Sequence, residues 1–250
     1  MRYFMAFSYF GREYHGWQRQ PNAITIQQVM EDSLSTLLNQ KIELVGAGRT
    51  DAGVHAKEMF AHFDVTEIPS LEDLKHRLNA FLPADIALRF IQEVPSQAHA
   101  RFDALSRTYE YWLVNHKDPF LKDGAHYVSK ALDVYAMNTA AAYLLEFTNF
   151  KCFSKSNSDV RTFNCRIDEA FWTQNGQQLI FTIKADRFLR NMVRAIVGTL
   201  LDIGRGRIAV EDVKTIIKSE DRSKAGASVP AKGLYLTKIE YPEKILNFHG

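Results

Sequence analysis

GAGRTDAGVHA, residues 46–56, is the most unusual stretch of the chain and the starting point for its fold. Its three glycines and three alanines contribute little to a core, but they permit tight turns and close approach of the backbone to another group. The glycine spacing fits neither a dinucleotide fingerprint nor a phosphate-binding Walker loop. Composition alone favours a surface loop with an Asx turn at Asp51, placed between two strands.

Hydrophobic periodicity predicts regular elements on both sides of this loop. Thr25 is expected to cap a helix, with Gln28 completing a capping box. Ser70 is expected to open a second helix that ends at Pro83. The predicted strands of this part of the chain are 2–10, 42–45, 58–65 and 85–94, and its predicted helices are 26–39 and 71–82.

The rest of the chain repeats this plan in outline. Asn175-Gly176 is its strongest hairpin signal. Residues 219–232 show no periodicity and are expected to be a mobile loop or a segment ordered only by a ligand. The predicted strands here are 108–115, 166–173, 178–185 and 233–241, and the predicted helices are 134–147, 188–201 and 210–218.

We therefore expect an α+β fold of two similar halves, each with a mixed or antiparallel sheet and two helices, their sheets joined around a central cleft. The expected halves are residues 1–100, which contain the Asp51 loop, and residues 101–250, which contain Tyr109 and Arg194. The 250-residue length suits two units of this size.

The composition of the chain excludes several classes of protein. The chain is 46% apolar with a formal charge of +2, so bulk charge does not indicate a non-specific nucleic-acid binder. Cys152 and Cys165 fit no zinc spacing and make no disulfide scaffold, which favours a reducing compartment. We find no secretory signal and no apolar run long enough for a membrane span, so we expect a soluble cytoplasmic protein.

Residues 48–56, GRTDAGVHA, resemble the signature of the tRNA pseudouridine synthase A family. Five further stretches support the resemblance in the same order along the chain: YHGWQ at 14–18, HARF at 99–102, RTYEY at 107–111, FLRNMVR at 188–194 and PAKGLYL at 230–236. The resemblance therefore spans nearly the whole chain.

The resemblance implies isomerisation of uridine to pseudouridine in the anticodon arm of tRNA, by a homodimer that needs no metal or cofactor. Asp51 matches the family's catalytic aspartate, and Tyr109 matches the tyrosine that packs on the target base. Arg194 matches the basic residue that pairs with the aspartate. Considered by residue type alone, Tyr109 is better explained as a core aromatic of a strand, and Arg194 is equally a residue on a solvated helix face.

The residue chemistry agrees with this implication. Breaking the C1′–N1 bond and rejoining C1′ to C5 oxidises nothing, and a carboxylate such as Asp51 can act as nucleophile or as the base of an elimination. A nearby guanidinium favours the ionised form of a carboxylate. Arg187, Arg190 and Arg194 have helical spacing, which predicts that they share one face.

The target base must leave its stack before a carboxylate can reach it. Arg49 is our candidate for the side chain that fills the gap, with a salt bridge to the fold as the equal alternative. The other predicted RNA-binding residues are His99, Arg101, Phe102, Arg107 and Tyr109.

Two other functions remain open at this point. The first is a non-catalytic tRNA-binding or tRNA-folding protein, which would have no need of a carboxylate that repels phosphate. The second is a hydrolase with Asp51 as general base, which lacks the metal cluster or Ser-His pair usual for such enzymes. His15, His55 and His62 have no carboxylate or thiol at ligand spacing, so we expect no metal site.

Overall fold

The structure, a computed structural model, describes residues 1–156 and 160–246. The chain forms two compact units. The first unit consists of Met1–Ser106 together with the chain from Tyr235 onward, and the second is Arg107–Leu234. The division expected from the sequence, 1–100 and 101–250, did not include this return of the last strand to the first unit.

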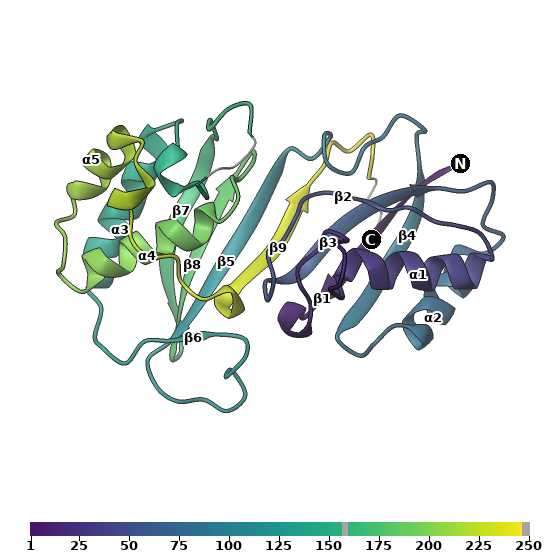
Figure 1. Ribbon diagram of the computed structural model, residues 1–250, viewed down its shortest axis with the longest axis horizontal. Coiled ribbons are helices and arrows are strands. Elements are labelled where there is room, and N and C mark those ends of the chain that lie inside the picture. Colours follow the sequence, from purple (N-terminus) through teal and green to yellow (C-terminus); the bar gives the residue numbers. More distant parts are fainter. Residues whose placement is uncertain (157–159, 247–250) are drawn as a thin grey trace. The chain divides into compact units, whose positions relative to one another are not determined.

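The first unit has a mixed sheet with the strand order β4-β1-β3-β9, and β2 pairs with β3 (Figure 1). The central strand β1 is antiparallel to both β3 and β4, whereas β3 and β9 run parallel. The strands are β1 (Arg2–Tyr9), β2 (Val45–Gly46), β3 (His55–Asp64), β4 (Ile86–Val94) and β9 (Leu234–Glu240).

Two helices, α1 (Ile26–Leu38) and α2 (Leu71–Phe81), pack beside each other, and α2 lies against β4 (Figure 1). Each begins at a predicted cap: Thr25 accepts a hydrogen bond from the backbone N–H of Gln28, and Ser70 accepts one from that of Asp73. A short 3₁₀ helix, η1 (Gly11–Glu13), follows β1.

The second unit has an antiparallel sheet in the order β5-β8-β7, and the short β6 runs parallel to β5. Gly176, with a positive φ of 57°, turns the chain between β7 and β8, so the predicted hairpin is confirmed. The strands are β5 (Ser106–Val114), β6 (His126–Tyr127), β7 (Ile167–Asn175) and β8 (Gln178–Ala185).

The helices of the second unit gather around α3, which packs against α4, α5 and β7 (Figure 1). Asp133 caps α3 as predicted, accepting a hydrogen bond from the N–H of Ala136. The helices are α3 (Val134–Tyr143), α4 (Met192–Gly204) and α5 (Asp212–Ser219), with 3₁₀ turns η2 (Leu144–Glu146), η3 (Lys151–Phe153), η4 (Arg222–Lys224) and η5 (Ala231–Gly233).

Both units have aromatic cores. The largest fully buried side chains include Phe4, Phe7, Trp17, Phe60 and Phe63 in the first unit, and Tyr111, Phe150, Phe153 and Phe181 in the second. Cys152 and Cys165 are both buried and free, and burial raises the pKa of their thiols to about 12 and about 11. The observed α+β class confirms the predicted one, with α5 as a third helix in the second unit.

Several predictions differ from the structure. Residues 42–44 are not a strand, and the short β2 starts at Val45. The helix expected from residue 188 starts at Met192 because Asn191 has a left-handed φ of 67°. Residues 219–232 are held by the chain itself: the Arg222 guanidinium donates to the carbonyls of Ala225 and Gly226.

None of the helices among the described residues has the length and apolar character that a membrane span requires.

Candidate active site

The Asp51 loop leaves β2 and enters β3. Its first residues are fixed by Ala47, whose N–H donates to the carbonyl of Phe60 at 2.8 Å. After Asp51 the chain makes a turn, in which the N–H of Val54 donates to the carbonyl of Asp51 at 3.2 Å. Gly53 has a φ of 74° at the third position of this turn, where type II turns require a positive φ. The glycine therefore sets the backbone direction immediately after the carboxylate.

The segment Tyr14–Trp17 packs directly on this loop. The N–H of Trp17 donates to the carbonyl of Thr50 at 3.1 Å, and the N–H of Gly53 donates to the carbonyl of Tyr14 at 3.2 Å. These two bonds flank Asp51 on both sides along the chain. The two bonds fix the backbone of Asp51, and its side chain is half-buried.

Buried side chains of the first unit also hold the loop in place. Tyr9 on β1 shares a hydrogen bond of 2.8 Å between its hydroxyl and that of Thr50. The ring of His55 stacks between Phe10, at 4.0 Å, and Tyr235, at 4.7 Å. Its Nδ1 accepts the N–H of Gly11 at 2.9 Å, so His55 supports the loop as a neutral ring.

Arg49 lies exposed two residues before Asp51, and no ion pair within the described residues holds its guanidinium. The salt bridge considered as its alternative role is therefore absent from this part of the structure. Its exposure leaves the predicted role in RNA binding as the one to test.

Three of the other predicted binding residues form one turn of the first unit. His99 Nδ1 accepts hydrogen bonds from the N–H groups of Arg101 and Phe102, at 3.1 and 3.3 Å. The Phe102 ring is 75% exposed, lies 4.3 Å from the His99 ring and has the Arg101 guanidinium 5.8 Å from its centroid. Such an aromatic face with a neighbouring cation is suited to stacking a nucleic-acid base.

The turn is anchored to the sheet by His62 of β3. His62 Nδ1 accepts the N–H of Ala100 at 3.1 Å, and its ring packs on His99. Burial, together with the nearby charge of Arg2, lowers the pKa of His62 to about 4. Burial also lowers the pKa of His99, so both rings are neutral at physiological pH.

In the second unit, Tyr109 and Arg107 lie two residues apart on β5 and therefore point to the same face of the strand. The Tyr109 ring is half-buried and meets Phe188 edge to face at 5.1 Å. Arg107 donates to the carbonyl of Asp186 at 2.9 Å. Tyr109 is thus neither fully in the core nor fully exposed.

Arg194 lies in the first turn of α4, where its side chain is held in place. Its Nε donates to the carbonyl of Val229 at 2.7 Å, and the N–H of Val229 donates back to the Arg194 carbonyl at 3.2 Å. The hydroxyl of Tyr111 donates to the next carbonyl, that of Pro230, at 2.8 Å. The Val229-Pro230 segment therefore ties α4 to β5, the strand that carries Tyr109.

The predicted common face of Arg187, Arg190 and Arg194 was wrong. Arg187 and Arg190 precede α4, which begins at Met192, so only Arg194 has a helical position. Their spacing imitated helical periodicity across a non-helical connection. Within residues 1–156 and 160–246, no group of three His, Cys, Asp or Glu side chains is placed to hold a metal ion.

Residue chemistry did not single out three residues that support the loop, Tyr9, Gly16 and Trp17. Gly16 has a φ of 87°, and a Cβ there would lie 2.4 Å from the carbonyl oxygen of Thr50. The available signal was the stretch YHGWQ, whose importance the resemblance had indicated without a physical reason.

Comparison with known proteins identifies the family. The family model described as tRNA pseudouridine synthase matches residues 5–103 and 140–242. The chain is 50% identical to the tRNA pseudouridine synthase A of Parabacteroides distasonis over 245 residues, which cover 98% of this chain and 97% of that protein. It is 50% identical to the protein of the same name from Porphyromonas gingivalis, covering 98% of each chain.

A more distant relative gives the same result. The tRNA pseudouridine synthase A of Geobacter sp. strain M21 is 41% identical over 238 residues, which cover 94% of this chain and 96% of that protein. The matches cover 96–98% of each of these relatives, and the family model's match includes the loop with Asp51. The chain therefore belongs to the tRNA pseudouridine synthase family, and by that membership it is an isomerase.

Proposed function

We propose that this chain isomerises uridines in the anticodon arm of tRNA to pseudouridine, with Asp51 as the catalytic carboxylate. The observation that supports the proposal most is the construction of the Asp51 loop. Main-chain hydrogen bonds to Tyr14 and from Trp17 fix the loop on both sides of a half-buried carboxylate. A reactive group held by rigid supports needs little reorganisation when the substrate binds.

The reaction leaves the composition of the nucleoside unchanged. The C1′–N1 bond breaks, the uracil turns, and C1′ bonds to C5; the proton lost from C5 is balanced by one gained at N1. Asp51 acts either as the nucleophile on the sugar or base, or as the base of an elimination. Both routes need the ionised carboxylate next to the everted nucleoside.

Tyr109 and Arg194 are proposed to complete the site from the second unit. Their support comes from the Val229-Pro230 segment, which holds the Arg194 side chain and ties it to the strand of Tyr109. Arg194 would pair with Asp51 and favour its ionised form, and the Tyr109 ring would pack on the target base.

RNA binding is proposed to use groups of the first unit together with Arg107 of the second. Arg49 would occupy the gap left by the everted base, and Phe102, next to Arg101 and His99, would stack an unpaired base. Arg107 would contact phosphate. We further propose a homodimer acting in the cytoplasm, where one subunit holds the tRNA body while its partner performs the reaction.

The proposal is tested with tRNA carrying tritium at C5 of uracil. The unaltered chain should release tritium and Asp51→Ala should release none. Asp73→Asn, which alters an exposed carboxylate of α2 in the same unit, should match the unaltered chain. Tight tRNA binding without tritium release from any tRNA would instead identify a non-catalytic tRNA-binding protein.

A further inference from the structure

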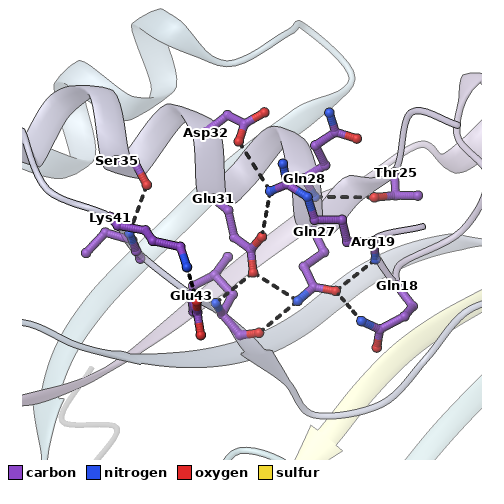
Figure 2. Close-up of polar contacts among 12 residues, drawn as sticks. Gln18, Arg19, Thr25, Gln27, Gln28, Glu31, Asp32, Ser35, Lys41 and Glu43 are labelled. Atoms are coloured by element: carbon purple, nitrogen blue, oxygen red, sulfur yellow. Dashed lines mark hydrogen bonds and ion pairs between the residues drawn. The ribbon is translucent and has the colours of Figure 1, made fainter. Parts of the chain in front are cut away.

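We propose that Gln27 and Glu31 of α1 are positioning residues for Asp51, acting through the backbone of the loop; this inference rests on the proposed function. Neither residue touches the loop's reactive carboxylate. Figure 2 shows Gln27 and Glu31 at the centre of a polar network. The network joins α1 to the segment 17–19, which supports the loop, and to the chain just before the loop.

Glu31 is a charged side chain in the core of the first unit, only 6% exposed. Its Oε1 accepts the N–H of Leu44 and the Nε2–H of Gln27, both at 2.9 Å, and its Oε2 accepts from the Arg19 guanidinium at 3.1 Å (Figure 2). Burial of a carboxylate is expensive unless such partners satisfy it. Leu44 lies two residues before Gly46, so Glu31 fixes the entry to the loop.

Gln27 uses every hydrogen-bonding position of its amide. Its Oε1 accepts from the Arg19 N–H at 2.9 Å and from Gln18 Nε2 at 2.8 Å. Its Nε2 donates to Glu31 and, at 3.0 Å, to the carbonyl of Leu44. An amide offers two donors and two acceptor lone pairs, so this one has no capacity left. No other residue type of this size can make these four bonds.

The network reaches Asp51 through Trp17. The N–H of Gln27 donates to the carbonyl of Trp17 at 3.0 Å, and the N–H of Trp17 donates to the carbonyl of Thr50 at 3.1 Å. The buried Trp17 indole also packs against Gly46, where a Cβ would meet its ring at 2.6 Å. A shift of α1 relative to the segment 17–19 is therefore passed to both ends of the loop.

The network is more specific than fold stability requires. A buried ion pair or amide can often be replaced by apolar side chains without loss of stability. This one instead joins three segments at fixed distances, and two of the three lead directly to the loop. We therefore expect its loss to act on the rate of reaction more than on tRNA binding, since the groups proposed to bind RNA lie outside the loop, apart from Arg49.

The test compares Gln27→Met, Glu31→Gln and the control Gln28→Met. Gln28 neighbours Gln27 on α1; its backbone N–H donates to the Thr25 cap, and its side chain makes no hydrogen bond within the described residues. For each variant we would measure the single-turnover rate of tritium release at saturating tRNA, the Kd for tRNA and the melting temperature. The rate is measured well below the melting temperature of every variant.

Gln27→Met should lower the single-turnover rate at least about tenfold, because small displacements of a reacting group have large effects, while the Kd changes less than about twofold. Gln28→Met should match the unaltered chain. If Gln27→Met fails to fold, Glu31→Gln serves, because it keeps an acceptor for Leu44 and removes the one used by Arg19. An unchanged rate in a folded variant, or a loss confined to the Kd, would overturn the inference.

The proposed function has its own control in the same assay. If Asp51→Asn retains activity, the proposed catalytic role of Asp51 is wrong whatever Gln27 does. If Asp51→Asn is inactive and Gln27→Met is fully active, the proposed function stands and only the positioning role is rejected.

Discussion

Gly16 lies so close to Thr50 that a Cβ on Gly16 would be 2.4 Å from the Thr50 carbonyl oxygen. Gly16 also has a φ of 87°, a conformation that side chains rarely adopt. The backbone position of Thr50, the residue before Asp51, therefore requires a glycine at position 16, which lies 34 positions earlier in the chain. This close approach is what allows the segment 14–17 to support the loop.

Gly16→Ala is expected to lower both stability and activity. Strain and the backbone clash together should reduce the free energy of unfolding by more than about 1 kcal/mol, measured by denaturant titration. Gly176→Ala is the matched control: it has a φ of 57°, but a Cβ there would meet nothing within 4 Å. Equal losses of activity for the two variants would show that the contact with Thr50 is unimportant.

Tyr9→Phe removes one buried hydroxyl and leaves the Thr50 hydroxyl without that partner. We expect the free energy of unfolding to fall by about 1–2 kcal/mol, with reduced tritium release. Tyr135→Phe, at a side chain that is 84% exposed, should change neither quantity. A Tyr9→Phe variant with unaltered stability would contradict the assigned support.

Arg194→Lys keeps the positive charge but loses the planar Nε–H that donates to Val229. We expect kcat to fall, by up to about 100-fold if the guanidinium orients Asp51, with a smaller change in KM. Arg207→Lys, at an exposed position beyond α4, is the control and should remain active. If Arg194→Lys retains full kcat, the position needs only charge and the geometric role of Arg194 is rejected.

The stability of the chain should fall on acidification from about pH 6.5 to about pH 4. His62 has a pKa of about 4 in the folded chain and an ordinary value near 6.5 when unfolded, so between these values the unfolded state binds more protons. The lowered pKa of His99 acts in the same direction. Denaturant titrations across this range should show a shallower decline for His62→Gln than for the unaltered chain; parallel curves would contradict this.

Binding of tRNA should weaken as salt concentration rises, because phosphate contacts release counterions. Arg101→Gln should reduce the slope of log K against log salt by about 1 if Arg101 contacts one phosphate. Lys41→Gln, at an exposed residue of the same unit paired with Glu43, should leave the slope unchanged. A salt-independent Kd would contradict the proposed mode of binding.

Local signals predicted much of this fold. The caps at Thr25, Ser70 and Asp133 and the Asn175-Gly176 hairpin were all found at their predicted positions, because these signals depend on neighbours in sequence. The start of α4 was missed because a single left-handed residue, Asn191, interrupts an otherwise periodic pattern.

Long-range features of the site were beyond the sequence. The signature contains Asp51, but nothing in it shows that Tyr14 and Trp17 hydrogen-bond to the loop or that the N–H of Gln27 donates to the carbonyl of Trp17. Such contacts join residues 10 to 39 positions apart, and neither periodicity nor propensity encodes them. The return of β9 to the first unit is a further case, since parallel pairing with β3 leaves no local trace.

The carboxylate of Asp51 is proposed to perform the isomerisation. To test this role, tRNA is incubated with the unaltered chain or with Asp51→Asn. The anticodon arm is then digested to nucleosides, and pseudouridine is quantified. We expect pseudouridine in place of uridine with the unaltered chain, and none with an Asp51→Asn variant that still binds tRNA. Pseudouridine formed at a comparable rate by Asp51→Asn would show that this carboxylate does not perform the reaction.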